Sequence, residues 1–235
     1  MFLLSYYFLE KIEMMEAKTS LKDNHWNFKD VLIVLISINI FTLVSYFFKI
    51  NTWLKIYPSP FFHIFLILLL VFIVKIRYKE KIKSLGINIS KKTITYGIWG
   101  GVIEFAMIYT IYYVFGDIEK SFNHVKLEIT SLKGVFDYIY YFSMIVLIGP
   151  AIEESIFRGI LYSPYRKKYG MYGGIFINAF IFTVTHYGVP VVPLIFGEII
   201  LSALYEKTET IIAPFIAHSI YNTSYFLVGL YYLSY

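Results

Sequence analysis

Residues 149–162 read GPAIEESIFRGILY and bring two adjacent carboxylates, Glu153 and Glu154, and the cation Arg158 into an apolar part of the chain. On a helix, Glu154 and Arg158 lie four residues apart on one face, where they can neutralise each other. Glu153 lies about 100° round the helix from Glu154 and lacks a helical partner of its own. The three residues therefore either lock two helices together or leave Glu153 available for chemistry.

The chain around this stretch has the composition of a membrane protein. Of its 235 residues, 58% are hydrophobic and only 16% are charged. Residues 31–48, 56–74 and 210–235 contain no Asp, Glu, Lys or Arg, and a helix needs about 20 such residues to cross a bilayer. The chain has no cysteine, which excludes disulfides, thiolate metal sites and cysteine nucleophiles.

We predict an all-α fold, a polytopic helical membrane protein with about seven transmembrane helices. A single helical membrane domain, residues 28–235, is expected to follow an N-terminal leader or interfacial segment at residues 1–27. Glycines and prolines concentrate between residues 149 and 222, which predicts broken or short helices around a central cavity. The apolar segments are expected at about 30–49, 58–76, 93–115, 135–157, 170–187, 190–205 and 210–233.

Basic residues set the expected orientation in the membrane. Residues 75–92 contain seven Lys or Arg and one Glu, a pattern typical of a cytoplasmic loop, so the N-terminus is also expected in the cytoplasm. Because the basic residues lie beside the spans, they favour contact with membrane lipids over nucleic acid.

Two further groups of polar residues fall within apolar segments. His186 ends the stretch FTVTH, and His218 and Asn222 are spaced i, i+4 in the stretch HSIYN. Each alone could be a structural residue, a histidine at the membrane interface or a polar pair that joins helices. Ionisable groups within spans are costly and usually mark a site, so their coincidence with Glu153 and Glu154 favours a functional cluster.

Three motifs in order carry a resemblance to a known family. EESIFR fits EExxxR, FTVTH fits FxxxH and HSIYN fits HxxxN, all within residues 149–222. The chain therefore resembles the CAAX protease and bacteriocin-processing family of intramembrane endopeptidases, also called the CPBP or Abi family. The resemblance implies an enzyme that hydrolyses a peptide bond inside the membrane.

The resemblance also implies roles for individual residues. Glu153 matches the glutamate that activates water, and His186 would help to hold that water. His218 and Asn222 match the pair that would donate hydrogen bonds to the oxyanion. Glu154 and Arg158 would orient and charge-balance the site. These roles suit the chemistry, since a carboxylate can take a proton from water and N–H groups can stabilise a developing negative oxygen.

The need for a metal stays open at the level of sequence. Glu153, His186 and His218 could supply three ligands to a divalent metal such as zinc, with an open fourth position. The chain has no HExxH motif, and the family is described both as metal-dependent and as using a glutamate without metal. We favour a mechanism with no obligatory metal.

Several partners and functions are compatible with these residues. The expected substrate is a peptide or lipidated protein: a prenylated C-terminal peptide, a bacteriocin or pheromone leader, or a membrane-protein segment. We expect a multi-pass protein of a prokaryotic cell membrane. The alternatives are a non-catalytic membrane scaffold or bacteriocin immunity factor and, with no internal inverted repeat in its favour, a proton-coupled transporter.

Two acidic residues within predicted spans depart from the family pattern. Glu198, in FGEIIL, could pair with Arg158 or a histidine, or only reach the membrane interface; Glu104, in GGVIEF, has no predicted role. Catalysis further requires Glu153 and His186 to meet. We therefore expect the fourth helix to continue to about Tyr165, with the fifth segment short or tilted.

Overall fold

The structure is a computed structural model in which the described residues are 26–47, 60–114, 129–130, 132–186 and 190–233. Within these ranges all regular structure is helical, which confirms the all-α prediction. The leader predicted at residues 1–27 lies outside the described residues, except for Trp26 and Asn27. The main helices are α2 (Phe28–Phe47), α4 (Pro60–Val71), α5 (Lys91–Val114), α7 (Val135–Ser143), α8 (Gly149–Ile156), α9 (Tyr162–Thr185), α10 (Val191–Thr208) and α11 (Ile212–Leu233).

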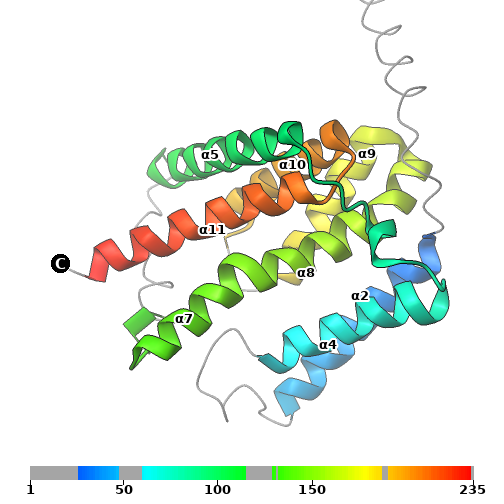
Figure 1. Ribbon diagram of the computed structural model, residues 1–235, viewed down its shortest axis with the longest axis horizontal. Coiled ribbons are helices and arrows are strands. Elements are labelled where there is room, and N and C mark those ends of the chain that lie inside the picture. The colour runs from blue at the N-terminus through cyan, green and yellow to red at the C-terminus, as the bar shows by residue number, and fades with distance from the viewer. Residues whose placement is uncertain (1–25, 48–59, 115–128, 131, 187–189, 234–235) are drawn as a thin grey trace, which may run out of the picture.

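Wide π-helical turns and one short helix connect several of these elements. They are η1 (Phe72–Arg77), η2 (Ile82–Leu85), η3 (Met144–Ile148) and η4 (Phe157–Leu161), of which η2 is a 3-10 helix. Figure 1 shows α5 and α11 side by side, with α10 behind them and α7 and α8 running along α11. Helices α2 and α4 lie on the far side of α8. The helix that carries the EESIFR stretch is thus enclosed between the two groups.

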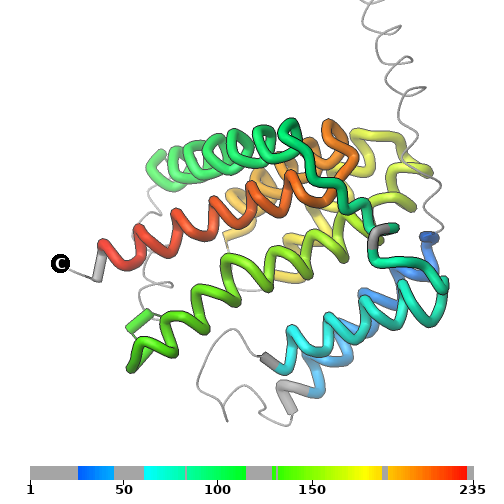
Figure 2. Tube along the Cα trace, viewed as in Figure 1, coloured from blue at the N-terminus to red at the C-terminus, as the bar shows by residue number. Residues whose placement is uncertain are grey.

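Helices α7, α8 and α9 form one helical run that reverses direction at Gly170. Figure 2 shows that no loop interrupts the run between Val135 and this glycine. Gly170 has φ 72° and ψ 179°, a conformation that only glycine adopts readily. Beyond it the chain packs back on itself, since a Cβ at Gly174 would lie 3.0 Å from the Cα of Arg166. The prediction that the fourth helix continues to about Tyr165 is confirmed.

The helices bury polar side chains and expose apolar ones. In α2, Leu32, Ile36 and Ile40 recur at helical spacing and are each more than half exposed, whereas Glu104 and Arg158 are buried. In the described part of the chain, α5 and the run Val135–Thr185 are long and apolar enough to cross a membrane, and only 28% of each apolar window is buried. A helix of a soluble core would bury most of this surface. These are features of a membrane protein.

Small residues let α5 approach α11 closely. A Cβ at Gly97 would lie 2.7 Å from Cβ of Ile216 and 2.9 Å from the carbonyl oxygen of Ala213. Neither neighbour can move freely, because one is a backbone atom and the other is the branched Cβ of its side chain. Helix association without a water-driven hydrophobic effect relies on such close packing.

Replacing Gly97 is therefore expected to destabilise the fold. We expect Gly97→Ala to cost about 1–3 kcal/mol, as overpacking of a close contact typically does, and to lower the midpoint of thermal unfolding in detergent. Gly134→Ala is the matched control, because a Cβ there meets nothing within 4 Å. Equal midpoints for the two variants would contradict the close α5–α11 contact.

Candidate active site

Arg158 lies at the centre of a buried network of charges. Its Nη1 donates to Oε1 of Glu154 at 3.0 Å, which is the i, i+4 pair predicted from the sequence. Its Nη2 donates to Oε2 of Glu198 at 2.5 Å and to the carbonyl of Glu198 at 3.3 Å. The side chains of Arg158 and Glu154 are fully buried. One guanidinium thus joins η4 to α8 and α10 through two carboxylates.

Glu154 connects this network to His218 on α11. Its Oε1 also lies 3.0 Å from Nδ1 of the histidine. A carboxylate at Nδ1 holds the proton on that nitrogen and leaves Nε2 to face the site. Nε2 of His218 lies 3.8 Å from Oε2 of Glu153.

His186 faces the other oxygen of the Glu153 carboxylate. Its Nε2 lies 3.9 Å from Oε1 of Glu153, and its Nδ1 lies 2.8 Å from the carbonyl oxygen of Phe182. Because a carbonyl can only accept, Nδ1 carries a proton, and Nε2 is the nitrogen that faces Glu153. Glu153 is only partly buried, with its side chain 25% exposed. The structure thus brings together Glu153, His186 and His218, as the sequence predicts.

Both gaps to Glu153 are too long for direct hydrogen bonds. At 3.8 Å and 3.9 Å, the carboxylate oxygens and the two Nε2 atoms lie beyond the usual 2.7–3.2 Å range. Polar groups separated by such gaps are commonly bridged by a water molecule. The arrangement can therefore hold a water against a carboxylate and an imidazole, which is what a general base needs.

Phe182 explains why FTVTH has an aromatic residue one turn before the histidine. Its ring stacks on that of His186, with centroids 4.0 Å apart and planes 13° apart. The rings of Phe182 and Phe157 pack edge to face, with centroids 4.7 Å apart. The guanidinium of Arg158 lies 5.8 Å from the centroid of the Phe182 ring. Sequence reasoning gave Phe182 no role, although its i, i+4 spacing from His186 was a usable signal.

Asn222 contacts the backbone of η3 instead of the Glu153 carboxylate. Its Nδ2 donates to the carbonyl oxygen of Ile145 at 2.7 Å. This carbonyl has lost its helical donors, because the N–H of Gly149 bonds to Met144 in the π-helical turn and Pro150 has no N–H. Asn222 thus satisfies a backbone acceptor that the Gly–Pro pair leaves open, and its second amide hydrogen remains available for another acceptor.

The residues predicted as metal ligands converge, but without the geometry of a metal site. In the part of the chain that the structure describes, no group of three or more His, Asp or Glu side chains could hold a metal ion. No step proposed below involves a metal.

Glu198 and Glu104, the two acidic residues that depart from the family pattern, have different surroundings in the structure. Glu198 pairs with Arg158, one of the two roles considered from the sequence. Glu104 is buried on α5 and lines a cavity that His218 also lines. Sequence reasoning could place Glu104 within a span, but it could not show which helix lies opposite.

Comparison with known proteins agrees with the motifs. Residues 135–224 match the model of a family described as type II CAAX prenyl endopeptidase Rce1-like. The matched region contains all seven residues that the three motifs specify. The chain matches no curated protein and no solved structure. Residues 135–224 are therefore similar to an Rce1-like CAAX endopeptidase domain, in agreement with the three motifs.

Proposed function

We propose that this protein is a CPBP-type intramembrane endopeptidase that hydrolyses a peptide bond in a membrane-associated peptide or protein. The observation that carries this proposal is the position of Glu153 between the Nε2 atoms of His186 and His218, at 3.9 Å and 3.8 Å. The Rce1-like match supports peptide hydrolysis as the reaction class. A non-catalytic scaffold would not need a carboxylate held between two imidazoles.

The proposed reaction begins with a water held by Glu153 and His186. Glu153 takes a proton from this water as the oxygen attacks the carbonyl carbon of the scissile bond. The oxyanion that forms accepts hydrogen bonds from His218 and from the second amide hydrogen of Asn222. Glu154 supports the first donor, because a carboxylate at Nδ1 stabilises a doubly protonated imidazole. The C–N bond then breaks, and the leaving amine takes the proton from Glu153.

We further propose that the single helical membrane domain, residues 28–235, crosses a prokaryotic cell membrane with about seven helices and a cytoplasmic N-terminus. The apolar faces of α2 and α5 and the basic residues 75–92 support this arrangement. The substrates that fit a site at membrane depth are prenylated C-terminal peptides, bacteriocin or pheromone leaders and similar segments. Membrane lipids are the other partner.

Glu153 and His186 are expected to be essential for cleavage. We expect Glu153→Gln and His186→Ala to lower the rate of peptide cleavage by about 10² to 10⁴-fold, the usual contribution of a general base. The assay is cleavage of fluorogenic prenylated and leader peptides by protein purified in detergent.

Glu209→Gln is the matched control, because Glu209 is exposed at the end of α10. It is expected to cut at the wild-type rate. If the Glu153 and His186 variants are folded and cut as fast as this control, the site assignment is wrong and a scaffold role replaces it.

Removal of divalent metal is expected to leave activity within about twofold of the untreated enzyme, because Glu153 itself accepts the proton from water. The measurement is cleavage after exhaustive dialysis against a chelator. Loss of activity that zinc restores would instead assign Glu153, His186 and His218 as ligands.

Asn222 is expected to have two separable effects. Asn222→Ala should lower the cleavage rate by about 10² to 10³-fold through loss of an oxyanion donor. It should also cost about 1–3 kcal/mol of stability, because the carbonyl of Ile145 is left without a donor.

The double variant Asn222→Ala/Pro150→Ala separates the two effects. An alanine at position 150 supplies the N–H that Ile145 lacks, so the midpoint of thermal unfolding should recover while the rate stays low. Recovery of both would show that Asn222 acts only on the backbone and would remove it from the oxyanion hole.

A further inference from the structure

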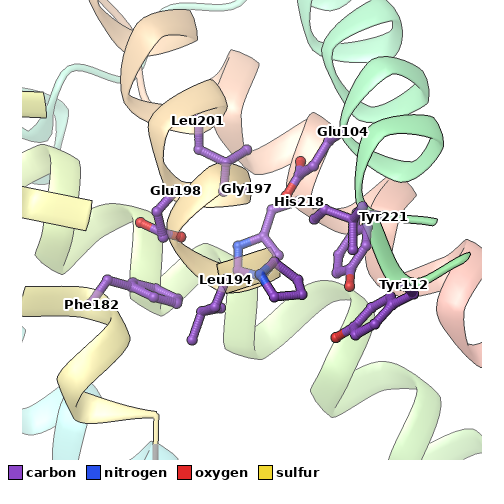
Figure 3. A pocket seen from close by; sticks show the side chains of 11 residues that line it. Glu104, Tyr112, Phe182, Leu194, Gly197, Glu198, Leu201, His218 and Tyr221 are labelled. Atoms are coloured by element: carbon purple, nitrogen blue, oxygen red, sulfur yellow. The ribbon is translucent and has the colours of Figure 1, made fainter. Parts of the chain in front are cut away.

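A small cavity adjoins the proposed catalytic cluster on the side of α5 and α10. The centres of water-sized molecules can occupy about 40 Å³ of this cavity. One water needs roughly 10–15 Å³ by the same measure. The cavity therefore has room for about three waters or for a small polar group. Figure 3 shows Glu104 and Glu198 on its wall, with His218 between them. His218 also faces Glu153, so the cavity and the catalytic cluster share a residue.

Glu104 is the unusual member of this lining. It is only 2% exposed, and its Oε2 is buried without a hydrogen-bond partner among the described residues. Gly197 on α10 leaves room for the Glu104 carboxylate, because a Cβ at this position would lie only 3.0 Å from Oε1 of Glu104. A buried carboxylate oxygen without a hydrogen-bond donor is costly, and the cost is usually met by a cation or a donor group.

The cations of the cluster are already engaged elsewhere. The guanidinium of Arg158 is bonded to both Glu154 and Glu198, and His218 is bonded to Glu154. When it is ionised, Glu104 therefore adds a negative charge to a network in which Arg158 and His218 are already bonded to other carboxylates.

The remaining walls of the cavity are largely apolar. They include Ile108, Phe182, Leu194 and Leu201. Apolar walls with a carboxylate at one side suit a side chain that has a methylene stem and a compact cationic head with several donors. Lysine has this form, whereas the guanidinium of arginine spreads its donors over a wider planar fork.

We propose that this cavity binds the ammonium end of a substrate lysine next to the scissile bond, with Glu104 as the residue that selects it. The proposal rests on the proposed peptidase function and adds a substrate preference to it. The lysine methylenes contact the apolar walls, and the ammonium donates to the open Oε2 of Glu104. A cavity that only stored water for the reaction would give no preference among peptides.

The test compares peptides that differ only in the residue on one side of the scissile bond: lysine, norleucine, arginine or glutamate. For the wild type we expect kcat/KM for the lysine peptide to exceed that for the norleucine peptide by about 10- to 100-fold. In Glu104→Gln the ratio should fall to near one, and in Glu104→Lys the glutamate peptide should be preferred to the lysine peptide. The control Glu209→Gln should keep the wild-type ratio.

A second measurement tests the cavity without catalysis. n-Pentylammonium should raise the midpoint of thermal unfolding of the wild-type protein in detergent, because a ligand that binds only the folded state stabilises it. n-Pentanol at the same concentration should not, and Glu104→Gln should lose the response to n-pentylammonium.

The outcomes separate the two proposals. If no peptide is cut but n-pentylammonium stabilises the wild type and not Glu104→Gln, the peptidase proposal fails and the cation site stands. If the wild type cuts lysine and norleucine peptides equally, or if Glu104→Gln keeps the wild-type ratio, the lysine subsite is overturned. An equal loss of activity on every peptide in Glu104→Gln would also overturn it and indicate a water reservoir.

Discussion

The buried guanidinium of Arg158 is the group on which the arrangement of this site depends. It holds Glu154 and Glu198 at 3.0 Å and 2.5 Å, and Glu154 in turn holds His218 at 3.0 Å. The chain of contacts links η4, α8, α10 and α11 in a region with little access to water. Removing one partner of such a buried pair typically costs about 3–5 kcal/mol, because the other charge is left uncompensated. The same contacts fix the orientation of the imidazole that faces Glu153.

Irregular helix geometry puts these residues in register. The π-helical turns η3 and η4 lie on either side of α8, which carries both glutamates, and π-bulges in helices often occur at functional sites. The first of these turns costs the backbone a hydrogen bond at Ile145, and the side chain of Asn222 replaces it. One residue of the HxxxN motif thus supports the π-helical turn that precedes α8, the helix that carries Glu153.

Local patterns in the sequence predicted much of this structure. The apolar segments correspond to described helices, and the Glu154–Arg158 contact follows from i, i+4 spacing. The meeting of Glu153 with both histidines could be expected only from the three motifs taken together. Contacts between distant segments were harder to predict. From the sequence, Glu198 could pair with Arg158 or a histidine, or reach the membrane interface. The contact between Asn222 and Ile145 depends on a π-helical turn that no sequence pattern predicts. The reversal at Gly170 lies where the sequence placed the boundary between the fourth and fifth segments, although the conformation of this glycine was not predicted.

The most direct test of the central claim, that Glu153 activates water for direct attack, is a single turnover in water labelled with ¹⁸O, followed by mass spectrometry of the new C-terminal carboxylate. Direct attack predicts one ¹⁸O atom in the product of the first turnover. An unlabelled product, with the label found instead in the carboxylate of Glu153, would show that the glutamate attacks the peptide itself and would contradict the account.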